Sequence, residues 1–277
     1  MSGSRSWPAV LTLLGIATII PELTTGNTPL PLLIQPGILA YLLLAYGLPV
    51  WALRELSVRL SMGPLGLAIS GLAYGILNEG LLAKTIFREA LPISSYDGYA
   101  TAGGVSWAWA AFITSWHAVA SVLLPIALTH AFFPRLAARP WARGWVPATG
   151  VAPIAVIGVT GFFSSTGEHQ GSPPELIALL AAMTALVVAA TRVKSTWREG
   201  SRASSLLVGL AGFPAVATLA VIAAAKVDPW WWTLAWLAWL GLGWLATRRG
   251  ASVGWLAAGF YAQTAALPLA MLLFAAH

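Results

Sequence analysis

The chain has 277 residues, of which 58% are hydrophobic and 9% are charged, and its mean hydropathy is +0.78. A soluble domain carries roughly a quarter of charged residues, so the composition excludes a soluble enzyme, a nucleic-acid-binding domain and a disordered tail. The formal net charge of +6 is better explained by basic loops that orient a membrane protein. The absence of cysteine excludes disulfides, thiolate metal sites and cysteine nucleophiles.

Nine apolar runs come close to the roughly 20 residues that a helix needs to cross a bilayer. They are residues 7–24, 33–53, 64–84, 105–131, 146–165, 174–192, 205–225, 230–247 and 251–274. The first run ends at Pro21–Glu22, and no small-residue cleavage site follows it, so it is interpreted as a span and not as a signal peptide. The sequence therefore predicts an all-α, polytopic membrane protein of about nine transmembrane helices, with residues 1–277 forming a single domain.

The basic residues test this count independently. With the N-terminus inside, twelve of the 15 Lys and Arg residues lie on the inner side, and only Lys84, Arg88 and Lys226 lie outside. Such an inner excess of positive charge is typical of membrane proteins, and an odd number of spans places the C-terminus outside. Glu22 is expected in an outer loop, whereas Glu79 falls within a span.

These observations define the expected location and partners. We expect a multi-pass protein of the plasma (inner) membrane, with the lipid bilayer as its main partner and no nucleic acid. A small-molecule or lipid-like ligand is expected, and a helix-mediated oligomer or a larger membrane complex remains an alternative. Most of the 15 Trp residues lie near predicted span ends, where the indole ring is most stable.

Glu79 is the most informative residue, because an ionisable side chain within a span costs at least a few kcal/mol unless it has a partner. Gly71, Gly75 and Glu79 are spaced four residues apart and therefore share one helix face. The two glycines allow another helix to approach closely. His117 in the next span is the expected partner of Glu79.

Further polar residues fall at a similar membrane depth. The candidate substrate-binding residues are Tyr74, Asn78, Thr114, Gln263 and Thr264. No metal site is expected, because Glu168–His169 has no evident third ligand. No cofactor is expected either, since the sequence contains no P-loop or dinucleotide fingerprint.

The pair Glu79 and His117 supports three functions. It could exchange protons during transport or binding of a small solute at a polar site near the membrane midplane, which is the preferred prediction. It could act as the general acid or base of an intramembrane enzyme on a lipid-like or peptide substrate, so an enzymatic activity is left open. It could also pin two helices in a structural or accessory subunit.

Two short motifs resemble the glutamate-based CAAX-type intramembrane proteases. That family has two consecutive glutamates with an arginine four residues after the second, and then a phenylalanine with a histidine four residues beyond. Here Asn78 occupies the first glutamate position, and Lys84 follows Glu79 by five residues. His117 likewise follows Phe112 by five residues. The resemblance covers two of the nine runs and implies catalytic roles for Glu79 and His117.

The longest outer connection, residues 85–104, is rich in turn-forming residues. Asp97, Gly98 and Gly103–Gly104 predict turns. The segment is expected to be either a lid over an outer opening or a solvated connection between two helices.

Overall fold

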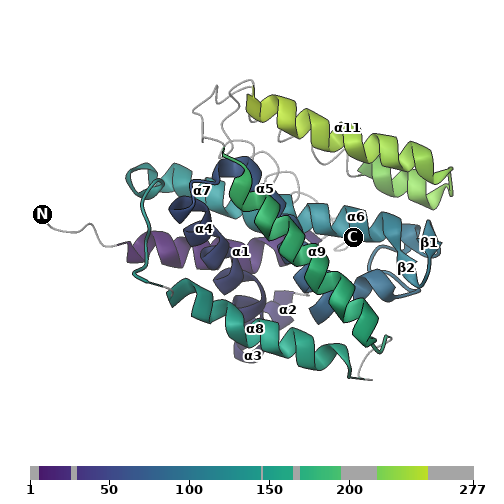
Figure 1. Ribbon diagram of the computed structural model, residues 1–277, viewed down its shortest axis with the longest axis horizontal. Helices are drawn as coiled ribbons and strands as arrows, with labels where there is room; N and C mark the ends of the chain where they lie inside the picture. Colours follow the sequence, from purple (N-terminus) through teal and green to yellow (C-terminus); the bar gives the residue numbers. More distant parts are fainter. Residues whose placement is uncertain (1–5, 26–29, 145, 165–168, 195–216, 249–277) are drawn as a thin grey trace, which may run out of the picture.

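The computed structural model describes residues 6–25, 30–144, 146–164, 169–194 and 217–248, and these form a bundle of helices (Figure 1). The α-helices are α1 (Trp7–Thr25), α2 (Leu30–Leu33), α3 (Pro36–Leu42), α4 (Leu48–Arg59), α5 (Gly63–Ile76), α6 (Trp107–Trp116), α7 (Leu124–Phe132), α8 (Val146–Phe162), α9 (Pro173–Arg192) and α11 (Pro229–Arg248). Residues 217–224 are also helical.

Three long helices each contain a wider π-helical turn: η1 (Leu43–Gly47) joins α3 to α4, η2 (Leu77–Leu82) ends α5, and η5 (His117–Leu123) joins α6 to α7. Two of these turns precede a proline, Pro49 or Pro125. A proline lacks an N–H group and its ring clashes with the carbonyl group four residues earlier, so a widened turn relieves the conflict. Turns of this kind occur frequently at functional sites.

Four helices of the described residues are long and apolar enough to cross a membrane: Pro36–Arg59, Gly63–Leu82, Trp107–Phe132 and Pro173–Arg192. Shorter apolar helices cover Trp7–Leu23 and Val151–Phe162. Helices thus lie where the apolar runs predict them over the described part of the chain. The run 251–274 and most of 205–225 lie outside the described residues, so the count of nine and the orientation stay predictions.

The first predicted span differs from expectation at its end. α1 continues through Pro21 to Thr25, and Glu22 is buried within it at 6% exposure. The prediction of an outer-loop Glu22 was therefore wrong. The helix is already well formed before Pro21, and a proline there bends a helix more readily than it ends one when the flanking segment packs well.

α5 packs against α6 and η5 at very short range. A Cβ atom at Gly71 would lie 2.7 Å from the Cα atom of Ala118, and one at Gly75 would lie 2.7 Å from the Cα atom of Thr114. No real side chain tolerates these distances, so only glycine fits at both positions. The close approach predicted from the glycine spacing is confirmed for these two helices, and it sets η2 beside η5.

At one end of the bundle, Arg54 ties α4 to the segment that follows α7. Its guanidinium is fully buried, pairs with Glu55 at 2.6 Å and donates to the carbonyl oxygens of Leu136 and Ala137. The guanidinium carbon also lies 3.6 Å from the centre of the Trp141 ring. Charge-assisted hydrogen bonds and a cation–π contact together make this a structural clamp.

At the other end, the connection 85–104 folds compactly. It contains two 3₁₀ turns, η3 (Thr85–Phe87) and η4 (Ser94–Tyr96), and the strand β1 (Thr101–Ala102), which forms a hairpin with β2 (Val105–Ser106) just beyond it. Gly103 and Gly104 form the hairpin tip with φ of 60° and 75°, values that favour glycine. The predicted turns are confirmed. Burial raises the pKa of Tyr96, which keeps its phenol neutral in the packed base of this connection.

Candidate functional site

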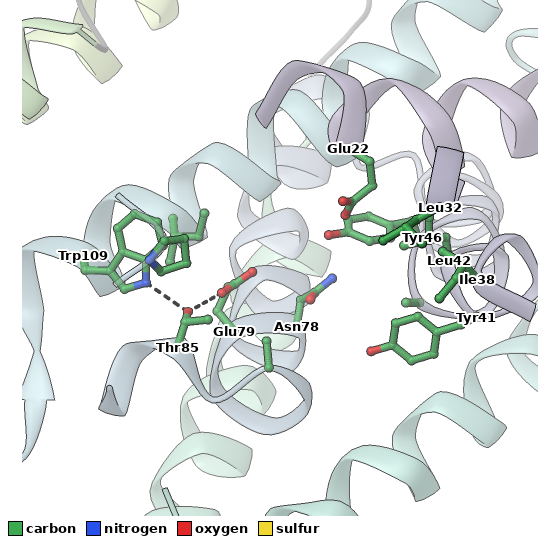
Figure 2. A pocket seen from close by; sticks show the side chains of 14 residues that line it. Glu22, Leu32, Ile38, Tyr41, Leu42, Tyr46, Asn78, Glu79, Thr85 and Trp109 are labelled. Atoms are coloured by element: carbon green, nitrogen blue, oxygen red, sulfur yellow. Dashed lines mark hydrogen bonds between the residues drawn. The ribbon is translucent and has the colours of Figure 1, made fainter. Parts of the chain in front are cut away.

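A cavity of about 360 Å³ lies among α1, α3, η1, η2 and the start of α6 (Figure 2). Its described lining residues are Glu22, Leu32, Ile38, Tyr41, Leu42, Ala45, Tyr46, Asn78, Glu79, Ala83, Thr85, Pro92, Trp109 and Ile113. This volume lies near the lower end of the roughly 300–1,000 Å³ found for small-molecule sites. The lining brings together segments that are far apart in the sequence, among them Thr85 and Pro92 of the connection 85–104.

Glu79 lies on the cavity wall with both carboxylate oxygens engaged. One oxygen, Oε1, is 2.8 Å from Nε2 of His117, and the other accepts a hydrogen bond from the hydroxyl group of Thr85. The indole N–H of Trp109 donates to that same hydroxyl oxygen at 2.9 Å (Figure 2). Glu79 itself is only 7% exposed.

The direction of these bonds follows from the donors available. An indole nitrogen can only donate, so the Thr85 oxygen accepts from Trp109. The Thr85 hydroxyl proton is then available to Glu79. Thr85 therefore donates to one oxygen of Glu79, whereas the direction of the contact with Nε2 of His117 depends on the imidazole tautomer. The hydrogen-bonded chain therefore runs from Trp109 through Thr85 to Glu79.

His117 lies behind Glu79, and the predicted contact between the two residues is present. Nδ1 of His117 is 3.0 Å from the hydroxyl oxygen of Ser121, and the ring lies 5.9 Å from that of Tyr46 and 5.6 Å from that of Tyr74. The order Ser121–His117–Glu79 has the composition of a nucleophilic triad. Ser121 is fully buried and does not belong to the described lining, so it can orient the imidazole but cannot meet a substrate in this cavity.

Glu22 is the acidic residue of the lining that sequence reasoning missed. It comes from α1, and its carboxylate points toward the hydroxyl group of Tyr46 (Figure 2). The available signal was an acid directly after an apolar run, but Pro21 was interpreted as the end of the helix. Two carboxylates from different helices thus face one cavity.

Asn78 also lines the cavity and is linked to the neighbouring helix. Its amide group donates to the hydroxyl group of Tyr74 at 3.1 Å, and Tyr74 in turn donates to the carbonyl oxygen of Ala45 at 2.9 Å. Pro49 has no N–H group to offer this carbonyl, so Tyr74 supplies a donor in its place. The amide oxygen of Asn78 accepts no hydrogen bond from the residues that the structure describes.

The other predicted site residues lie elsewhere. Tyr74 and Thr114 do not belong to the described lining, and the Thr114 hydroxyl donates to the carbonyl oxygen of Ala110 within its own helix. Gln263 and Thr264 lie outside the described residues. Within the described ranges, no group of three or more His, Asp or Glu residues could hold a metal ion.

Three residues that line the cavity lie close to helix ends, and the midplane depth of the site stays a prediction. Glu22 is close to the end of α1 at Thr25, Glu79 is close to the end of η2 at Leu82, and Trp109 is close to the start of α6. His117 lies further from the start of its helix than Trp109 does. A count of residues along one helix does not show on which side of His117 a cavity lies. The cavity lies on the side of the connection 85–104.

The fold and the cavity define a helical membrane protein with a partly open, acid-lined site. A family model matches residues 11–267, and the chain belongs to that family, an uncharacterized membrane protein family. Comparison with curated proteins gave no match, and comparison with solved structures gave none either. The family and the apolar helices together place the protein in a membrane.

Proposed function

We propose that this protein binds a small polar solute in the cavity and carries it across the plasma membrane, with Glu79 as the proton- or cation-responsive group. The observation that supports the proposal most strongly is the presence of two carboxylates, Glu22 and Glu79, on one cavity wall within an apolar bundle. Pinning two helices would require only the contact between Glu79 and His117. Glu22 also joins two helices through its side-chain hydrogen bond with Tyr46, but the solute-sized cavity that Glu22 and Glu79 share goes beyond what packing needs.

The proposed mechanism uses the contacts of Glu79. Solute and proton compete for its carboxylate, and His117 accepts or returns the proton through the 2.8 Å contact. Ser121 keeps the imidazole oriented during this exchange, because it bonds the opposite ring nitrogen. Histidine suits such a relay, since its charge changes near physiological pH.

The test is solute-dependent proton flux in proteoliposomes loaded with a pH-sensitive dye. The solutes are a panel of small amines, sugars and carboxylic acids, and the variants are Glu79→Gln and Glu89→Gln. Glu89 is exposed, so its variant is a matched control for loss of one carboxylate. We expect Glu79→Gln to abolish the flux and Glu89→Gln to preserve it.

A flux that is unchanged in Glu79→Gln and His117→Ala, with only a lower unfolding temperature, would overturn the proposal in favour of a structural role. A wild-type protein that shows no solute-dependent flux with any panel member would overturn it as well.

A second candidate is an intramembrane hydrolase, and the contact between His117 and the cavity-lining Glu79 favours it. Glu79 would remove a proton from water as the general base, and His117, which lies outside the described lining, would hold the Glu79 carboxylate in place. This is the role that the resemblance to the glutamate-based proteases implies. Turnover of a fluorogenic transmembrane peptide in detergent, without any gradient and lost in Glu79→Gln, would identify this activity.

A further inference from the structure

The chemistry of the cavity wall narrows the class of solute. We infer that the cavity binds a small protonated amine, which is a cation with N–H donors and a short hydrocarbon part. This inference rests on the proposed function, since it names the substrate class of the same site.

The polar part of the wall consists of acceptors. Glu22 and Glu79 contribute carboxylates, and Asn78 contributes an amide oxygen without a donor among the described residues. No Lys, Arg or His side chain belongs to the lining that the structure describes. An anionic solute would meet two acidic side chains and no basic one in this lining, whereas an ammonium group is attracted to an ionised carboxylate.

The remaining wall fits the rest of such a ligand. Tyr41, Tyr46 and Trp109 line the cavity, and an aromatic ring attracts a cation that lies over its face by about 0.5–2 kcal/mol, depending on solvation. Leu32, Ile38 and Leu42 lie on the side of the cavity away from Glu79, with Leu32 beside Tyr46 (Figure 2). The polar groups therefore suit the ammonium end of the ligand, and this apolar side suits a short alkyl chain.

The acceptors also distinguish between kinds of cation. A primary ammonium has three N–H donors, which can serve a carboxylate and the Asn78 oxygen together. A quaternary ammonium has the same charge but no donor. A bare metal ion is disfavoured by the size of the cavity, and no group of three His, Asp or Glu ligands occurs among the described residues.

The test is calorimetric binding to the purified full-length chain in detergent at pH 7. The probes are n-butylamine, butan-1-ol, butanoate and butyltrimethylammonium, which share one alkyl chain and differ only in the head group. We expect the amine to bind about tenfold or more tightly than the other three. Glu22→Gln and Glu79→Gln should each weaken amine binding by about tenfold, while Glu89→Gln leaves it unchanged.

Equal affinity for the alcohol, butanoate or butyltrimethylammonium would overturn the amine assignment, as would full amine affinity in Glu22→Gln. If Glu79→Gln fails to fold, the probe comparison on the wild-type chain and the Glu22→Gln variant still decide the matter. Glu79-dependent flux of a neutral or anionic solute without amine binding would overturn this inference and leave the proposed function standing. Amine binding without any Glu79-dependent flux would overturn the transport proposal alone.

Discussion

A carboxylate in an apolar bundle depends on the donors around it, and Glu79 obtains them from different segments. His117 comes from the neighbouring helix, and Thr85 from the connection beyond η2. Trp109 does not contact Glu79 through this bond but sets the role of Thr85. Because the indole N–H donates to the Thr85 oxygen, the Thr85 hydroxyl proton is directed to Glu79. The hydrogen-bond partners of Glu79 are therefore supplied both by helix packing and by the connection 85–104.

Replacing Thr85 by valine tests this dependence. The isosteric Thr85→Val change removes a donor from Glu79 and an acceptor from Trp109, and it should destabilise the fold by about 1–3 kcal/mol. Thr85→Ser retains the hydroxyl group and should cost less. Thermal unfolding in detergent measures both variants, and equal unfolding temperatures for Thr85→Val and wild type would contradict the network.

Sequence reasoning reached only part of this site at the residue scale. Glu79 and His117 could be predicted, because each is a polar residue in an apolar run, and the glycine face of α5 points Glu79 at a neighbour. Thr85 and Trp109 could not be predicted, since nothing in the sequence shows that a threonine in a connection forms a hydrogen bond with a buried acid. Glu22 was missed because whether a helix ends or continues at a proline depends on packing that the sequence does not show.

At the scale of elements, the contact between α5 and the α6–η5 helix determines the distance between Glu79 and His117. Gly71 and Gly75 lie on this contact, two turns and one turn before Glu79 on the same face. The glycine spacing predicted a close helix contact on this face, and the order of the spans along the chain favoured the His117 helix as the neighbour. The sequence did not predict the π-helical turns at Glu79 and His117, because no residue pattern marks them apart from the nearby prolines.

Gly75→Ala should therefore separate the two helices. The new Cβ atom would lie 2.7 Å from the Cα atom and 2.9 Å from the carbonyl oxygen of Thr114, and neither backbone atom can move alone. We expect a destabilisation of about 1–3 kcal/mol together with loss of Glu79-dependent flux.

Gly15→Ala is the matched control for this change. Gly15 lies within α1, and a methyl group added there would meet no other atom within 4 Å, so alanine should leave stability unchanged or raise it slightly. Both variants are compared by thermal unfolding in detergent. A Gly75→Ala protein as stable and active as Gly15→Ala would show that the close contact does not hold the site together.

At the scale of the whole molecule, segments that the charge pattern assigns to one side of the membrane contact each other. Lys226 donates to the carbonyl oxygen of Asp97, and both residues are predicted outside. Lys194 donates to that of Leu60, and Arg59 to that of Ala142, all from predicted inner segments. Loop charge predicts only the side of the membrane on which each connection lies. It does not predict which connections contact each other, and helix packing leaves no comparable mark in the sequence.

The orientation can be measured directly, because the chain has no native cysteine. Ala102 and Ala138 are exposed and lie in connections that the basic residues place outside and inside, respectively. In sealed right-side-out vesicles, a membrane-impermeant maleimide should label Ala102→Cys at once and Ala138→Cys only after lysis. The opposite pattern would invert the orientation, and labelling of both before lysis would contradict the alternation of sides. Since Glu79 lies on the side of the connection 85–104, this result also decides from which face of the membrane a solute first reaches the cavity.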